Sequence, residues 1–164
     1  MDRLRVRVPA ILLAVSMLLT GCATSPFVEL DAGVDPIGPA DALSNPAQAG
    51  RQVIWGGEIV AVYNLEGFTE LEIVARPLDG ADRPKRQAEG GVRFIIRQAG
   101  FLEPLTYAPG RFVTALGTFD GVEMRDVGQF TTDQPVLNSR QIELWPVVEQ
   151  SPFDNISVGV GVQL

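Results

Sequence analysis

The chain has 164 residues, with 13 basic and 20 acidic side chains, no histidine and one cysteine. An acidic chain lacks the basic surface that phosphate binding needs, which disfavours nucleic acid and anionic headgroups as partners. Without histidine, a Ser-His or Cys-His nucleophile and a histidine-bound zinc site are excluded, and a single cysteine excludes an intrachain disulfide. We therefore expect no catalytic constellation, no metal and no cofactor.

The first 21 residues are typical of a secretory signal peptide. Three arginines within residues 1–7 precede an almost wholly apolar run at 8–20, and Gly21 follows that run. A membrane-spanning helix needs about 20 apolar residues, so this run is too short to span. A core helix alternates polar and apolar faces, and this run does not.

The segment that ends in the cysteine, Leu19-Thr20-Gly21-Cys22, resembles the lipobox of bacterial lipoproteins. The resemblance implies that the signal is cut before Cys22, that its thiol takes a diacylglycerol, and that the freed amine is acylated, for example with palmitate. One chain of myristoyl length binds a membrane only marginally, with K about 10⁴ M⁻¹, whereas several chains hold durably. In Gram-negative lipoproteins, Asp after the cysteine retains the protein in the inner membrane. Ala23 therefore implies transfer to the outer membrane.

The mature chain is predicted to begin with a flexible tether and a short helix. Proline and glycine recur across 22–38, which is typical of an extended linker. A helix is expected near 39–49, capped by Asp41 or Asn45 and stopped by Gly50.

Strand patterns begin after residue 50. The segment 51–64 is rich in Val, Ile and aromatics, and its pair Gly56-Gly57 suggests a bulge or a sharp barrel bend. Asp120-Gly121 is expected to form a hairpin turn. Further strands are expected at 68–76, 92–98, 111–119, 122–127 and within 135–148.

Five or six short strands with one short helix predict a mostly β fold. We expect a small closed or partly open OB-like barrel over 39–146, with a small open α+β sheet or a β-sandwich as the alternative. The tail 147–164 either adds an edge strand or stays mobile. By period two, the core is predicted to contain Trp55, Leu71, Ile73, Phe94, Ile96, Val113 and Leu144.

An ordered set of short motifs resembles one known family. It comprises Trp55-Gly56-Gly57, Arg76-Pro77-Leu78-Asp79, Arg93-Phe94, Gly100-Phe101-Leu102 with Pro104, Tyr107 with Pro109-Gly110-Arg111, Val113-Thr114, Gly117 and Trp145. With the lipobox, this set resembles the Slp family, the starvation-inducible outer-membrane lipoproteins of Gram-negative bacteria. The resemblance implies a lipid-anchored protein with a small β-rich periplasmic domain, and it implies no catalytic residue or ligand.

Two kinds of strand residue are candidates for function. Trp55 is suited to stacking on a ligand, and the alternative is a core position. Glu70 and Glu72 share one face of a strand, as a glycosidase carboxylate pair does. The alternative, which we favour for these two carboxylates, is a solvated polar face.

The long polar loop 79–91 is the other candidate region. Asp79 and Asp82 are oxygen ligands of the kind that hard cations prefer, but the loop lacks the regular ligand spacing of a calcium loop. Long loops on rigid scaffolds often carry binding, so we expect a partner to contact this loop.

Two functional hypotheses remain open on sequence alone. The first is a non-catalytic structural or interaction module of the envelope, anchored through Cys22, facing the periplasm, with an envelope protein as partner and a stress-related role. The alternative is an envelope enzyme or a binder of glycan or cell-wall material, which a pocket with convergent polar groups would support.

Overall fold

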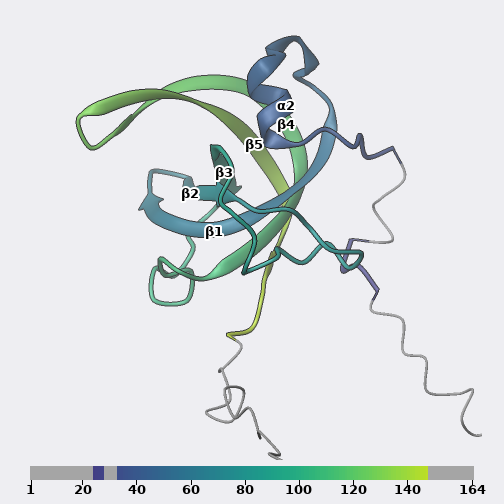
Figure 1. Cartoon of the computed structure of the whole chain (residues 1–164). Helices are drawn as coiled ribbons and strands as arrows, with labels where there is room; N and C mark the ends of the chain where they lie inside the picture. Colours follow the sequence, from purple (N-terminus) through teal and green to yellow (C-terminus); the bar gives the residue numbers. More distant parts are fainter. Residues whose placement is uncertain (1–23, 28–32, 148–164) are drawn as a thin grey trace, which may run out of the picture.

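The computed structural model describes residues 24–27 and 33–147, and within them the chain forms a closed five-stranded barrel (Figure 1). The strand order around the barrel is β1-β2-β3-β5-β4, with β3 and β5 parallel and the other neighbours antiparallel. The strands are β1 (Gln52–Asn64), β2 (Phe68–Ala75), β3 (Arg93–Ala99), β4 (Phe112–Val127) and β5 (Phe130–Leu144). The prediction of a mostly β, OB-like barrel is confirmed.

A short helical segment precedes the barrel where it was expected. The helix α2 (Pro39–Ser44) is followed by the 3₁₀ turn η2 (Pro46–Gln48). Asp41 accepts a hydrogen bond from the Gly38 N–H at 3.2 Å, which stabilises the first turn of α2. Among the described residues, no helix is both long and apolar enough to cross a membrane.

The core follows the period-two pattern of β2 and β3. Six of the seven predicted core residues are buried, and Leu144 is half-buried against them. Trp55 packs edge-on against Phe94, with ring centroids 5.4 Å apart, and it also contacts Phe119. This aromatic cluster packs with aliphatic side chains in the buried core of the barrel.

The glycine pair in β1 marks a corner of the barrel. The first half of β1 pairs with β4 and the second half pairs with β2, and Gly57 takes part in both ladders. A Cβ on Gly57 would lie 2.1 Å from the Val74 carbonyl oxygen. The predicted bend therefore depends on an approach of backbones that only glycine permits.

The predicted hairpin at Asp120-Gly121 is wrong. Gly121 lies inside β4 at a break in register, with a φ of 123° that suits a bulge, and the chain reverses after Val127, at Gly128. Beyond the bulge, β4 and β5 continue as a curved ribbon that projects from the barrel in Figure 1. We call residues 121–136 the arm.

Candidate functional site

The outer face of β2 and β3 is covered by the arm rather than by solvent. Glu70 lies opposite Arg97 in the β2–β3 ladder, on the face that points away from the core. The prediction that the β2 carboxylates are solvated is wrong for Glu70, which is only 4% exposed. Its burial follows from the length of β4, which brings Arg125 of the arm over this face.

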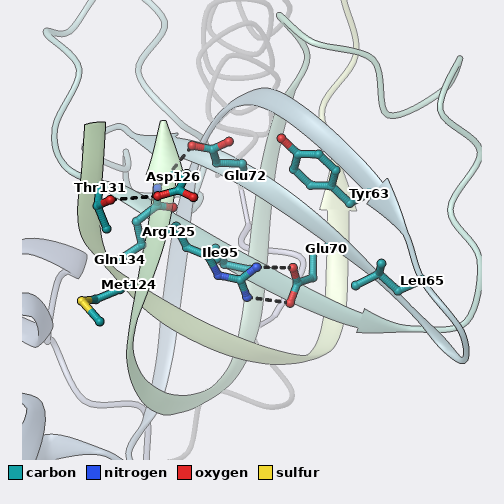
Figure 2. Close-up of a pocket in the computed structure, with 10 residues that line it drawn as sticks. All are labelled: Tyr63, Leu65, Glu70, Glu72, Ile95, Met124, Arg125, Asp126, Thr131 and Gln134. Carbon is teal, nitrogen blue, oxygen red and sulfur yellow. Dashed lines mark hydrogen bonds and ion pairs between the residues drawn. The ribbon is translucent and has the colours of Figure 1, made fainter. Parts of the chain in front are cut away.

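Glu70 is held by two arginines that come from different strands. Arg125 binds it with both guanidinium ends, Nη1 to Oε2 and Nη2 to Oε1, each at 3.0 Å (Figure 2). Arg97 donates to Glu70 Oε1 through Nη2 at 2.7 Å and Nε at 3.0 Å. Glu123 contacts both arginines, at 2.5 Å from Arg125 and 3.2 Å from Arg97. This network clasps the arm to β2 and β3.

The pKa shifts in this network favour the charged forms. Partial burial opposes ionisation of Glu123, but hydrogen bonds from Arg125 and Arg97 outweigh it and lower the pKa of Glu123. Burial also opposes the charge of Arg97 and Arg125, but hydrogen bonds to Glu70 and Glu123 raise the pKa of each guanidinium. Glu123, Arg97 and Arg125 are therefore charged at neutral pH.

The second carboxylate of β2 has its own partners. Arg93 donates to Glu72 Oε1 at 2.7 Å, and the Gln134 amide nitrogen donates to the same oxygen at 3.3 Å. Gln134 comes from the arm and is 1% exposed, yet its side-chain oxygen has no hydrogen-bond partner in the described part of the chain. A buried amide oxygen without a hydrogen-bond partner costs free energy. This position is therefore more typical of a ligand-binding site than of a contact whose polar groups are all satisfied.

A cavity of about 520 Å³ lies between the arm and the outer face of β2 and β3. This volume is within the range of small-ligand pockets. Figure 2 shows the ten lining residues, which are Tyr63, Leu65, Glu70, Glu72, Ile95, Met124, Arg125, Asp126, Thr131 and Gln134.

The rim of the cavity is apolar and its floor is charged but paired. Tyr63 and Leu65 are each about half exposed, at 53% and 50%, and Met124 is 77% exposed. Exposed large apolar side chains grouped beside a cavity are typical of contact surfaces. Because Glu70 and Glu72 are engaged by arginines, neither is free to act as the acid or nucleophile of a glycosidase pair. The arrangement suits binding better than covalent chemistry.

The three binding candidates from the sequence, Trp55, Asp79 and Asp82, lie away from this cavity. Trp55 is 1% exposed in the core, and its indole N–H donates to the Ile37 carbonyl at 2.6 Å. The Asp79 carboxylate accepts hydrogen bonds from the backbone N–H groups of Arg83 and Ala81, which lower its pKa. Asp82 accepts a hydrogen bond from the hydroxyl of Ser25.

These contacts give Asp79 and Asp82 structural roles in the loop 79–91. Across the described residues, no group of three or more His, Cys, Asp and Glu side chains is placed to hold a metal ion. Cys22 and Ala23 lie outside the described residues, so lipidation and sorting stay predictions.

Sequence reasoning missed the arm residues that complete the site. Arg125 and Gln134 are separated from Glu70 and Glu72 by 55 and 62 residues, so local periodicity carries no sign of these contacts. One signal was available, because Glu123 and Arg125 share a strand face at a spacing of two, as Glu70 and Glu72 do.

Strand order and site together define the class of protein, an OB-like barrel whose β2–β3 face bears a cavity closed by the last hairpin. A family comparison then gives the particular group. The chain belongs to the outer membrane lipoprotein Slp family, whose model matches residues 19–158. The resemblance noted from the sequence is confirmed, and the match extends past Trp145 into the tail. The protein is thus an outer-membrane lipoprotein of the Gram-negative type.

Two relatives from Escherichia coli (strain K12) have similar sequences. The outer membrane protein Slp is 31% identical over 143 residues, covering 85% of this chain and 76% of that protein. The uncharacterized lipoprotein YeaY is 30% identical over 139 residues, covering 82% of this chain and 70% of that protein.

Solved structures with a similar backbone include two single-stranded DNA-binding proteins. The small one from Streptomyces coelicolor has a TM-score of 0.35 and 15% identity, covering 58% of this chain and 94% of its own. The mitochondrial protein Rim1 of S. cerevisiae has a TM-score of 0.34 and 15% identity, covering 61% and 99%. These likenesses concern the backbone, and no ligand follows from them.

Proposed function

We propose that this lipoprotein is a non-catalytic interaction module, anchored through Cys22 and facing the periplasm, that binds an envelope protein at the cavity beneath the arm. The observation that carries the proposal is the apolar rim of Tyr63, Leu65 and Met124 over a floor of paired ions. The apolar rim residues supply contact area for a partner. Because the charges of the floor are already paired within the protein, partners whose shape or polarity does not match the cavity are disfavoured.

The absence of histidine and the pairing of both β2 carboxylates support a binding role over catalysis. A stress-related role fits the same proposal. A non-catalytic binding module binds more of its partner when more of the module is present, so its effect would follow a change in its amount under stress.

Site-specific photocrosslinking in intact cells tests the proposal. A benzophenone amino acid replaces Tyr63 or Met124 in the full-length protein, and the control position is Arg140, which is exposed on β5 and does not line the cavity. We expect a discrete adduct from both rim positions, none from Arg140, and its loss when Leu65→Glu is added. Equal adducts from all three positions would show that the cavity is not the contact surface.

A second candidate, binding of a soluble cell-wall fragment, is favoured by one observation. The buried Gln134 oxygen, which has no hydrogen-bond partner among the residues that the structure describes, lies at a cavity large enough for a small ligand. Titration of the protein with purified muropeptides, followed by amide chemical shifts, should move the signals of Gln134 and Tyr63 if this candidate holds. Shifts spread evenly over the barrel would count against it.

A further inference from the structure

The residues that follow the predicted lipidation site are fixed to the barrel. The Ser25 hydroxyl donates to the Asp82 carboxylate at 2.5 Å and accepts a hydrogen bond from the Phe27 N–H at 3.0 Å. Phe27 is completely buried. The amide nitrogen of Gln141 on β5 donates to the Pro26 carbonyl at 3.3 Å. We call residues 24–27 the docked leader.

The acceptor of the docked leader is itself rigidly placed. Asp82 has a φ of 57°, in the left-handed region that Asp tolerates better than most residues. Its carbonyl accepts a hydrogen bond from the Thr114 hydroxyl of β4 at 2.7 Å, and that hydroxyl oxygen accepts one from the Trp145 indole at 2.9 Å. Ser25 is therefore connected to Thr114 of β4 and to Trp145, which follows β5, through polar contacts that are at least partly buried.

This geometry limits how far the barrel stands from its anchor. Cys22 precedes Thr24 by two residues, and two extended residues span about 7 Å. We infer that the docked leader acts as a clamp, so that the barrel lies against the membrane that holds its acyl chains and turns the loop 79–91 toward the headgroups. The inference rests on the proposed anchoring through Cys22, and it deepens that proposal by giving the domain one orientation.

The charge of the loop 79–91 suits this position. Arg83, Lys85 and Arg86 are exposed, and the guanidinium groups of the two arginines lie over the rings of Trp145 and Phe112, 4.9 and 4.6 Å from their centroids.

Three acidic residues in the same loop balance these charges, which leaves the loop neutral. Loss of residues 1–21 removes three arginines and one acidic residue from the chain, so the mature protein keeps ten basic and nineteen acidic side chains, a net charge of −9. Anionic headgroups therefore repel this loop less than the chain as a whole, which revises the expectation that they are disfavoured everywhere.

The clamp also places the candidate site. In Figure 1 the docked leader lies at the right of the barrel, whereas the arm projects to the upper left. A membrane on the side of the leader would leave the arm and its cavity facing away from the lipid, open to periplasmic partners.

A fluorescence-quenching experiment on the acylated full-length protein tests the clamp. Because Cys22 is modified in the mature protein, an introduced cysteine gives a single labelling site. Lys85→Cys reports on the loop, and Gln129→Cys, at the tip of the arm, is the matched control. Each labelled protein is reconstituted in vesicles of phosphatidylethanolamine and phosphatidylglycerol that carry a nitroxide on the headgroup.

We expect quenching of the label at position 85 and little at position 129. The double substitution Ser25→Ala/Phe27→Ala should reduce quenching at position 85 to the level at 129, while the barrel stays folded because Phe27 is outside its core cluster. Ser25→Ala alone, which removes both hydrogen bonds of the Ser25 hydroxyl, should act in the same direction.

Equal quenching at both positions would overturn the orientation, and quenching at 85 that survives both variants would overturn the clamp. Mass spectrometry of the same samples separates these outcomes from failure of the anchor itself. A mature N-terminus without acyl groups would refute the anchoring and the clamp together.

Discussion

Removal of the Glu70 carboxylate is expected to release the arm while leaving the barrel intact. Glu70 receives four hydrogen bonds from Arg97 and Arg125, and its side chain is 5% exposed. Among the described residues, Glu70→Ala leaves Arg97 with Asp120 and Glu123, and Arg125 with Glu123, as acidic partners. The arm then loses its strongest connection to the face that it covers.

The magnitude follows from how buried the two arginines are. Breaking a fully buried ion pair costs about 3–5 kcal/mol. Arg97 and Arg125 are 23% and 32% exposed, so water screens and solvates them in the variant. We therefore expect a loss of about 2 kcal/mol. For a domain of this size that is roughly an 8 °C fall in melting temperature.

The assay is thermal unfolding of a soluble chain that begins at Thr24, combined with amide hydrogen exchange. Glu66→Ala is the control, because Glu66 is exposed in the β1–β2 turn, and such substitutions usually change stability by less than about 0.5 kcal/mol. Glu70→Ala should speed exchange in the arm at Arg125 and Thr132, and leave Trp55 protected. A melting temperature equal to that of Glu66→Ala would refute the clasp. Equal loss of protection in the arm and the core would show that the arm is not a separate unit.

Four further predictions concern the anchor, the core and the pH response. Cys22→Ser should leave an unprocessed precursor without acyl groups, measured by mass spectrometry, and an unmodified wild-type N-terminus at Met1 would contradict it. Ala23→Asp should hold the protein in the inner membrane on density fractionation; wild-type protein found mainly with inner-membrane markers would refute the sorting role. Phe94→Ala should cost about 3–5 kcal/mol, against less than about 1 for Glu72→Ala, and equal losses would invert the assignment of strand faces. The pKa of Glu123 is lowered in the folded protein, so its ionised carboxylate contributes to the stability of the fold above its ordinary pKa of 4.5, and this contribution is lost as the pH falls below that value. Glu123→Gln should therefore flatten the decline of the melting temperature in acid.

Period two was sufficient to predict the inner faces of β2 and β3. Leu71 and Ile73 alternate with Glu70 and Glu72, and a strand whose faces differ this strongly has one register that buries its apolar side. The glycine pair of β1 was also informative, because close backbone approach is a local demand that a local sequence can show. Alternation identifies which side chains point away from the core, but it carries no information about which distant segment of the chain packs over them.

The arm was missed for the same physical reason. Asp-Gly favours a turn, but whether the chain reverses there or bulges and continues depends on the partner strand, and β5 begins nine residues after Gly121. Once the chain continues to Val127, the distal half of β4 is long enough to place Arg125 over Glu70. The docked leader escaped prediction likewise, since its proline and serine suit a linker and the role of Phe27 depends on a pocket built elsewhere.

These two unpredicted features bring the arm and the membrane anchor into one arrangement. The docked leader meets the barrel near Thr114 of β4, and the arm is the far half of that same strand. If the proposed clamp holds, β4 is fixed near the membrane at one end and carries the site at the other, so the orientation of the lipid anchor would set the orientation of the cavity. Loosening the leader would then leave the cavity intact but randomise its direction. A partner fixed in the envelope would lose contact with the site, whereas a freely diffusing wall fragment would bind as before. The Ser25→Ala/Phe27→Ala variant therefore separates the two proposed functions: rim adducts that are lost in the variant select the protein partner, and muropeptide shifts that persist in it select the soluble ligand.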